Sequence, residues 1–515
     1  MSVRGPDAQP GTARAAVPAG GTALPSWLAA GLVFLSSGAV LVLEVLSLRL
    51  IAPYIGVTLE TSTSVIGAAL AAIAFGAWMG GRVADLADPR KLLGPVLLLA
   101  GAATLLVLPL VRWTGRLAGG SDVSSVLLLA TAAVFIPAAL LSAVTPLVVK
   151  LQLGDLARTG SVVGRYSGIG TLGAILATFA TGFVLVATLP STAIVLGLGG
   201  VLVAAGLAVL ALLGLGAVRG PGGPAILGVF VLLGSLTVLA PNPCQVETAY
   251  HCARVVADPS REGGRTLELD TLRHSYVDLD DPTHLEFRYV QAIASLADVL
   301  RPPGAPVQAL HLGGGGMTVP RYLAATRPGS ESLVLEIDPG VVELDQRELG
   351  LRTGPDLQVE VIDARVGLAR QPDEAYDLVV GDAFGGVAVP WHLTTAETVR
   401  DVDRVLRADG VYAANVIDNP PNALVEAEVA TFRTVFPYVA VVAAPEDLRG
   451  AGGGNFVLLG SARPLPLDAL RARLAERGTG YAVAAGEDAA RFAGSARPLT
   501  DERAPVDQLL NPYSS

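Results

Sequence analysis

The chain of 515 residues is 51% hydrophobic and only 16% charged, with a net charge of −10 at pH 7. A mean hydropathy of +0.54 is too apolar for an ordinary soluble protein, and the acidic balance argues against a nucleic-acid partner. The two cysteines, Cys244 and Cys252, are too few for a disulfide scaffold or a closed zinc site. Because apolar residues concentrate before residue 241 and charged residues after it, we expect a membrane half followed by a soluble half.

Residues 1–24 are rich in Gly, Ala and Pro, which predicts a disordered cytoplasmic tail. Residues 25–240 contain seven apolar segments long enough, or nearly so, to cross a bilayer. They lie near 26–50, 62–84, 92–111, 123–149, 166–188, 192–214 and 224–240. The last is the shortest. This half is therefore predicted to be a multi-pass α-helical membrane domain, with the lipid bilayer as its partner.

Positive charge predicts the orientation of these segments, because cytoplasmic loops are enriched in Lys and Arg. With the N-terminus inside, the inner residues are Arg4, Arg14, Arg82, Arg90, Lys91, Lys150, Arg158, Arg165 and Arg219, against Arg49, Arg112 and Arg116 outside. Seven crossings from a cytoplasmic N-terminus place the soluble half outside the cell membrane. An oxidising compartment there would let Cys244 and Cys252 pair, although two free thiols are equally open.

Two features of the membrane half are candidates for function. Glu44 lies within the first segment, where a carboxylate is costly and suggests a functional site; an ion pair with Arg49 or a polar contact in the bundle is the alternative. The stretch from Gly81 to Lys91 is similar to the loop between helices two and three of major-facilitator transporters, and is otherwise an ordinary basic inner loop.

Residues 241–300 are expected to form a β-hairpin and a linker helix. The hairpin is predicted from the alternating runs 266–270 and 274–280, and the helix from apolar spacing over 284–300.

Residues 301–515 alternate between strand and helix patterns. Strands are expected at 307–312, 332–337, 357–362, 376–381, 411–417, 438–443 and 454–460, and helices at 317–326, 340–348, 393–407 and 422–435. This alternation predicts an α/β Rossmann-like domain, with a parallel sheet covered by helices on both faces.

The first strand of this domain runs into four consecutive glycines, Gly313 to Gly316. Glycine lets the backbone approach a ligand closely, and the following helix offers unpaired N–H groups. An acid about 20 residues further on, at the end of the second strand, is placed to hold a ribose hydroxyl. Glu336 and Asp338 occupy that place. The pattern predicts a nucleoside-type ligand rather than a structural turn.

Further acids follow the next two strands, at Asp363 and Asp382. Because the carboxyl ends of parallel strands meet at one edge of the sheet, we expect these acids to surround one cleft beside the glycine turn, where the nucleoside-type ligand would bind.

The motifs LHLGGGGMTVPRYL, LVLEIDPGVVEL, VIDARVGL and YDLVVGDAFG resemble those of the spermidine synthases, or polyamine aminopropyltransferases. The chain also resembles their membrane-fused bacterial variants, the fused major-facilitator/spermidine-synthase proteins, over residues 246–461 and, in outline, over the membrane half. The segment ETAYHCARVV…RTLELDTLRHSYVD is similar to the β-hairpin region of that family. The resemblance implies a class I methyltransferase fold and transfer of an aminopropyl group from decarboxylated S-adenosylmethionine to putrescine or a related amine, without a metal.

The resemblance also implies residue roles. Glu336 would hold the ribose hydroxyls, Asp363 the adenine amino group, and Asp382 would accept the proton of the attacking amine. The implied cofactor-binding residues are Gly313, Gly314, Gly315, Glu336, Asp338, Asp363 and Ala364, and the implied substrate residues are Tyr250, His251 and Tyr289.

The sequence departs from the family pattern mainly on the amine side. The family loop GGGDGG has Gly316, Met317 and Thr318 in its last three places, and Gly385 replaces the second acid of Asp-x-x-Asp. Two alternatives therefore stay open: a methyltransferase-like or non-catalytic domain that binds S-adenosylmethionine, and a polyamine transporter or sensor. A homodimer is also left open. Since adenosyl cofactors are made in the cytosol, the side of the membrane is favoured as outside but not fixed.

Overall fold

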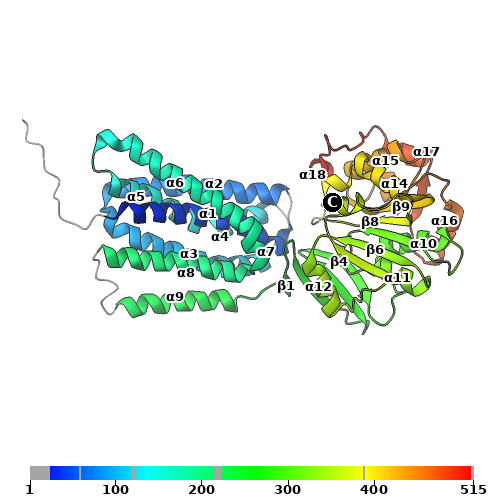
Figure 1. Ribbon diagram of the computed structural model, residues 1–515, viewed down its shortest axis with the longest axis horizontal. Helices are drawn as coiled ribbons and strands as arrows, with labels where there is room; N and C mark the ends of the chain where they lie inside the picture. Colours follow the sequence, from blue (N-terminus) through cyan, green and yellow to red (C-terminus); the bar gives the residue numbers. More distant parts are fainter. Residues whose placement is uncertain are drawn as a thin grey trace, which may run out of the picture.

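The computed structural model describes residues 24–56, 59–117, 123–213, 222–384, 386 and 389–511. It consists of a bundle of long helices and an α/β domain, joined end to end (Figure 1). Residues 1–23 of the predicted tail lie outside the described residues, as does Arg219.

The first body is a bundle of apolar helices. They are α1 (Ser26–Ile55), α2 (Leu59–Leu86), α3 (Pro89–Leu117), α4 (Val123–Ser142), α5 (Val144–Gln152), α6 (Thr159–Ala180), α7 (Val186–Thr188), α8 (Ser191–Leu212) and α9 (Gly222–Leu239). Six stretches are long and apolar enough to cross a membrane: Ser26–Ile55, Leu59–Leu86, Pro89–Arg116, Ser124–Gln152, Leu156–Thr188 and Ser191–Leu212. The predicted multi-pass helical region is thus confirmed for these six.

The seventh predicted segment is shorter than a full span. The α9 helix has 18 residues, or about 27 Å of helix against about 30 Å of hydrocarbon. Only its stretch Pro224–Leu239 is an apolar helix, and it falls below the length of the other six. The seventh segment, which the sequence predicts to be the shortest, is thus an apolar helix below the length of the other six in the described part of the chain. Figure 1 shows that α9 still lies beside α8 and leads from the far end of the bundle toward the α/β domain.

Small residues let the helices α2 and α4 pack closely. A Cβ added at Gly76 would lie 2.0 Å from the carbonyl oxygen of Ala139, and one at Gly80 would lie 2.7 Å from the Cα of Ala143. Contacts of this kind stabilise helix pairs in lipid, where burial of apolar surface contributes little.

Two sequence interpretations in the bundle are wrong. Arg49 lies 3.9 Å from Glu247 of the α/β domain, so its partner is not Glu44. The stretch from Gly81 to Asp85 forms the last turns of α2 rather than a loop.

The bundle meets the α/β domain at Glu247, in the short strand β1 (Val246–Glu247). The carboxylate of Glu247 accepts a hydrogen bond from the backbone N–H of Ser191, at the start of α8, at 2.7 Å. The guanidinium groups of Arg49 in α1 and Arg112 in α3 each lie 3.9 Å from it. One largely buried carboxylate therefore ties three helices of the bundle to the soluble domain.

We expect Glu247→Gln to destabilise this junction by about 3 kcal/mol or more, because it removes the nearest counter-charge of the buried Arg112 and of the partly buried Arg49. The measurement is the midpoint of thermal unfolding of the full-length protein in detergent. The matched control is Asp85→Asn, which breaks an ion pair with Lys150 whose side chains are 70% and 49% exposed. That variant should lose about 1 kcal/mol or less. Equal midpoints for the two variants would contradict the prediction.

A small antiparallel sheet follows the junction. Its strands lie in the order β1, β2 (Cys252–Ala257), β3 (Gly264–Leu269) and β4 (Leu272–Asp278). The predicted hairpin is confirmed as β3 and β4, and two further strands extend it. Cys244 and Cys252, whose pairing the sequence left open, form a disulfide that ties the chain before β1 to the start of β2.

The second body is an eight-stranded sheet with helices on both faces (Figure 1). Its strands are β5 (Gln308–Leu312), β6 (Glu331–Glu336), β7 (Leu357–Val361), β8 (Tyr376–Gly381), β9 (Leu406–Asp418), β10 (Tyr438–Ala443), β11 (Gly454–Ser461) and β12 (Ala482–Ala485). Its helices are α10 (Arg288–Leu300), α11 (Thr318–Thr326), α12 (Pro339–Glu348), α13 (Ala364–Leu368), α14 (Ala396–Val405), α15 (Ala423–Val435), α16 (Leu467–Glu476), α17 (Glu487–Ala493) and α18 (Val506–Leu509).

The sheet is only partly parallel. Its order is β12-β10-β11-β9-β8-β5-β6-β7. The five strands from β9 to β7 are parallel, whereas β10, β11 and β12 pair antiparallel. The prediction of an all-parallel sheet is wrong at this edge, because residues 444–453 between β10 and β11 are too few for a crossover helix. The α/β Rossmann-like fold itself is confirmed.

Alternating residues of each strand enter two cores. On β10, Val441 and Ala443 pack with α14 and α15, and Ala440 and Val442 pack with α10, α11 and α16. The strand order reverses between β5 and β8, which are neighbours although two strands separate them in sequence. Ligands of such sheets bind where this reversal occurs, beyond the carboxyl ends of the strands.

Candidate functional site

The glycine turn after β5 approaches the neighbouring strand end too closely for a side chain. Gly313 has φ +94°, and an added Cβ would lie 2.4 Å from the carbonyl oxygen of Asp382. Gly315 has φ +47°, and its Cβ would lie 2.5 Å from the hydroxyl of Ser275 in β4. The N–H of Gly316 donates to that same hydroxyl at 3.0 Å. The small sheet thus covers the turn from one side.

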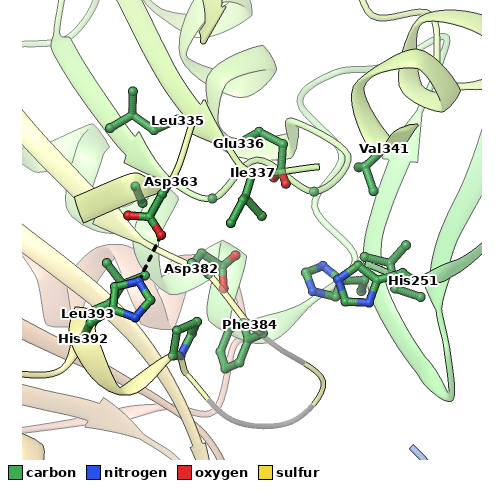
Figure 2. Close-up of a pocket in the computed structure, with 17 residues that line it drawn as sticks. His251, Leu335, Glu336, Ile337, Val341, Asp363, Asp382, Phe384, His392 and Leu393 are labelled. Atoms are coloured by element: carbon green, nitrogen blue, oxygen red, sulfur yellow. Dashed lines mark hydrogen bonds and ion pairs between the residues drawn. The ribbon is translucent and has the colours of Figure 1, made fainter. Parts of the chain in front are cut away.

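Glu336, at the end of β6, is held by the backbone around it. One carboxylate oxygen accepts the N–H of Gly314 and the other accepts the N–H of Asp338, both at 2.9 Å. A carboxylate has about four acceptor positions, so further positions remain for the hydroxyls of a ribose. Glu336 lines a cavity that is also bordered by His251, Gly313, Asp363, Asp382 and His392, called the first cavity from here on (Figure 2).

Asp338 has a different place. Its carboxylate caps α12 by accepting the N–H of Gly340 at 2.9 Å and also accepts the hydroxyl of Thr248. It is fully buried and does not line the first cavity. The geometry therefore gives Asp338 a supporting position beneath Glu336, and its predicted contact with a cofactor stays a prediction.

Asp363, after β7, faces the same cavity as Glu336 (Figure 2). One oxygen caps the short helix α13 by accepting the N–H groups of Arg365 and Val366, and the other lies 3.1 Å from the ring of His392. Ala364 also lines the cavity.

An apolar surface lies between these two acids. The side chain of Ile337 is 40% exposed and borders the cavity together with Leu335, Val341 and Leu393. An exposed branched side chain flanked by two carboxylates suits the face of a planar base, with the acids at the polar edges of the nucleoside.

Asp382, after β8, stands where two cavities meet. It lines the first cavity with Glu336 and Asp363, and it also lines a second cavity of about 410 Å³. Its carboxylate accepts hydrogen bonds from the side-chain amide of Asn415 at 2.9 Å and from the hydroxyl of Tyr289 at 3.1 Å.

The environment of Asp382 shifts its acidity. Burial raises its pKa to about 6, while the hydrogen bonds from Asn415 and Tyr289 lower it. A carboxylate with this pKa is ionised at neutral pH and can still take a proton, which is the requirement for a general base.

The implied substrate residues divide into two groups. Tyr289 lines the second cavity and touches Asp382, as just described. Tyr250 is 53% exposed and lines neither cavity. Its pKa is raised by burial and by the charges of Asp338, Asp363 and Glu336. Its contact with a substrate stays a prediction.

His251 lines the first cavity, with its ring 2.9 Å from Asp270. Burial lowers its pKa, but the hydrogen bond and charge of Asp270 and of further acids outweigh burial and raise it. Beside it His274, which the sequence did not single out, lines both cavities. Burial and the nearby His251 lower the pKa of His274 to about 4. The ring of His274 is therefore neutral at pH 7, whereas the ring of His251 favours the charged form.

The sequence also missed most of the second cavity. Its walls are Leu272, Arg273, His274, Glu286, Phe287, Arg288, Tyr289, Asp382, Phe384, Gly386, Asn415, Ile417, Asp447, Gly453, Gly454, Asn455 and Tyr481. Some of these residues come from loops, and others, such as Arg273 in β4 and Asn415 in β9, are polar residues within elements, so hydrophobic periodicity does not mark them. Within the described residues, no cluster of three or more His, Cys, Asp or Glu side chains could hold a metal ion.

We expect the rate of any reaction that uses Asp382 as a base to fall about tenfold per pH unit below pH 6, since only the ionised carboxylate accepts a proton. Tyr289→Phe removes a donor that favours this ionised form. The pH below which the rate of this variant falls should be higher by about one unit, because a hydrogen bond to a charge contributes about 1.5 kcal/mol or more. The control is Tyr322→Phe, which removes a hydroxyl bound to Asp298, away from both cavities. An unshifted profile for Tyr289→Phe would contradict the prediction.

Parts of the chain are similar in sequence to known proteins. No family model matches the chain. The polyamine aminopropyltransferase of Vibrio vulnificus (strain CMCP6) is 31% identical over 188 residues, which is 36% of this chain and 60% of that protein. The polyamine aminopropyltransferase of Chromobacterium violaceum (strain ATCC 12472) is 28% identical over 160 residues, covering 30% of this chain and 59% of the relative.

Among solved structures, a probable spermidine synthase from Corynebacterium glutamicum ATCC 13032 is 27% identical, with a TM-score of 0.46, over 50% of this chain and 95% of the other.

The order of the sheet, with its glycine turn and its acids at successive strand ends, defines an α/β domain of the class I methyltransferase type. Over about a third of its length the chain is similar to polyamine aminopropyltransferases, as its motifs predict. It spans 60% of the length of the Vibrio vulnificus relative.

Proposed function

We propose that this chain is a membrane-bound aminopropyltransferase that moves the aminopropyl group of decarboxylated S-adenosylmethionine to a small amine. The observation that carries the proposal is Asp382, which lies on the shared wall of two cavities with its pKa raised to about 6. The names of the relatives support the same chemistry.

The first cavity suits the adenosyl part of the donor. Glu336 would accept the ribose hydroxyls, and Asp363 would accept the amino group of an adenine that rests on Ile337. Gly313 and Gly315 have no side chains where the donor passes the turn. The sulfonium of the donor supplies an activated leaving group, so what the protein adds is position and a base.

The second cavity would hold the acceptor. An alkylammonium must lose a proton before its nitrogen can attack, and Asp382 can take that proton. The hydroxyl of Tyr289 and the amide of Asn415 hold the carboxylate in place from two sides. The carboxylates of both cavities also attract cations.

The test is release of methylthioadenosine by the purified full-length protein, given decarboxylated S-adenosylmethionine and a panel of diamines and amino-carboxylates. We expect release that depends on the acceptor. Absence of release with every acceptor would contradict the proposal.

Methyl transfer from S-adenosylmethionine is the second candidate, motivated by the altered amine side. Calorimetry with the two donors distinguishes them, because a site that accepts the decarboxylated donor among carboxylates should repel the extra carboxylate of S-adenosylmethionine. Tighter binding of S-adenosylmethionine would favour methyl transfer.

We also propose that the α/β domain lies outside the cell membrane and the N-terminus inside. Support comes from Arg49 and Arg112, two of the three positive residues assigned to the outside, which contact the α/β domain through Glu247. The Cys244–Cys252 disulfide supports it too, since such bonds persist in oxidising compartments. The domain would then need its donor delivered from the cytosol. A C-terminal reporter active only in the cytoplasm would contradict this orientation.

A further inference from the structure

The second cavity is walled by groups of both charges. It contains the carboxylates of Glu286, Asp382 and Asp447 and the guanidinium groups of Arg273 and Arg288. A simple diamine is cationic at both ends, so it can pair with the carboxylates but leaves the two guanidinium groups without an anionic partner. The mixture of charges favours an acceptor that is itself of mixed charge.

Both arginines are held by aromatic walls of the same cavity. The guanidinium of Arg273 lies 5.3 Å from the ring centre of Phe287, and that of Arg288 lies 5.3 Å from the ring centre of Tyr481. Within the described part of the chain, neither guanidinium is in salt-bridge contact with a carboxylate. Stacking on a ring leaves the in-plane N–H donors available, and these match a carboxylate in a two-pronged contact.

The same cavity places a negative group beside this positive pair. Asp447 is 7% exposed and is near enough to Arg288 for their charges to interact without forming a salt bridge. The head group of an α-amino acid carries an ammonium and a carboxylate on one carbon, and it requires this pairing of one anionic and one cationic site. Asp382 remains at the other wall, beside the donor cavity, for a second amine.

We propose that the acceptor is an α-amino acid with a side-chain amine, of the ornithine or lysine class, rather than a plain diamine. Its carboxylate would pair with Arg273 and Arg288, its α-ammonium with Asp447, and its side-chain amine would face Asp382. The proposal rests on the aminopropyl transfer proposed above. It also agrees with the sequence, in which Gly385 stands where the family has a second acid for a diamine.

The reaction balances without a further reactant. The side-chain ammonium gives one proton to Asp382, and the freed nitrogen lone pair attacks the aminopropyl carbon next to sulfur. The new C–N bond forms as the C–S bond breaks, and sulfur leaves with the electron pair as neutral methylthioadenosine. The product is a secondary ammonium, and Asp382 returns its proton to solvent.

The test uses acceptor pairs that differ only by the carboxylate: ornithine against putrescine, and lysine against cadaverine. Purified full-length protein is given decarboxylated S-adenosylmethionine, and methylthioadenosine release and the mass of the aminopropylated product are measured. We expect kcat/KM for at least one amino acid to exceed that of its matched diamine by about tenfold to a hundredfold, the range for a charge-assisted contact.

The double variant Arg273→Gln/Arg288→Gln should remove this preference by raising KM for the amino acid more than KM for its matched diamine. The control Arg471→Gln/Arg491→Gln removes the same charge from exposed positions on α16 and α17. It should keep the preference.

Wild-type preference for the diamines, or equal loss for both members of a pair in the double variant, would overturn this inference and leave aminopropyl transfer standing. Absence of methylthioadenosine with every acceptor would overturn both.

Discussion

Asp382→Asn should lower kcat for aminopropyl transfer by about 10²- to 10⁴-fold, the usual contribution of a positioned general base. The amide of asparagine is close in shape to the carboxylate but cannot take the proton of an attacking ammonium. The donors that hold Asp382, from Tyr289 and Asn415, would then face an amide, which accepts through one atom only. Initial rates at saturating donor and acceptor measure this change.

Two further measurements separate loss of the base from loss of the fold. Calorimetry with decarboxylated S-adenosylmethionine should show donor affinity within about tenfold of wild type, since Glu336 and Asp363 are untouched. The control Asp468→Asn, at a fully exposed acid of α16, should keep wild-type rates. A rate for Asp382→Asn within threefold or so of wild type would assign the proton transfer to another group.

Much of the first cavity, which we assign to the donor, could be predicted because each of its parts has a local signal in the sequence. The turn at Gly313 and Gly315 needs positive φ at a close approach, so glycine itself marks it. Glu336, Asp363 and Asp382 each end an apolar run, and successive ends of parallel strands meet at one edge. Strand periodicity and one topological rule are therefore enough to place three carboxylates together.

The rest depends on tertiary contacts that carry no such signal. Asn415 lies inside β9 and resembles any polar residue of a strand, yet it is the donor that holds Asp382. Tyr481 reaches the second cavity from the region after α16, where the sequence predicted no element. His392 is set against Asp363 by the turn before α14. Such residues are found only once the chain is folded.

The contact between the membrane bundle and the α/β domain also could not be predicted from the sequence. The sequence left an ion pair between Glu44 and Arg49 as one alternative, because the two are near in the chain. The structure instead pairs Arg49 with Glu247, far along the chain. Arg49 also donates to the carbonyl oxygen of Thr248, and the hydroxyl of Thr248 donates to Asp338. Two hydrogen bonds therefore connect the membrane bundle to Asp338, the residue that lies beneath Glu336.

Gly313→Ala should abolish binding of decarboxylated S-adenosylmethionine in the accessible concentration range. The added Cβ would lie 2.4 Å from the carbonyl oxygen of Asp382 and 2.9 Å from the Cα of Ala383, and backbone atoms cannot move aside as a flexible side chain can. The φ of +94° adds strain for any residue with a Cβ. Backbone strain and overpacking each cost about 1–3 kcal/mol. To relieve them, the glycine turn after β5 would have to move away from Asp382.

The matched control for this prediction is Gly329→Ala. Gly329 has φ +87°, but its added Cβ would have only one neighbour, the Cβ of Pro306 at 3.8 Å. It carries the strain of Gly313 without the collision and lies away from both cavities. We expect it to lower the midpoint of thermal unfolding while leaving donor affinity, measured by calorimetry, near that of wild type. Equal donor affinity for Gly313→Ala and Gly329→Ala would contradict this prediction. It would mean that the glycine turn after β5 does not contact the donor.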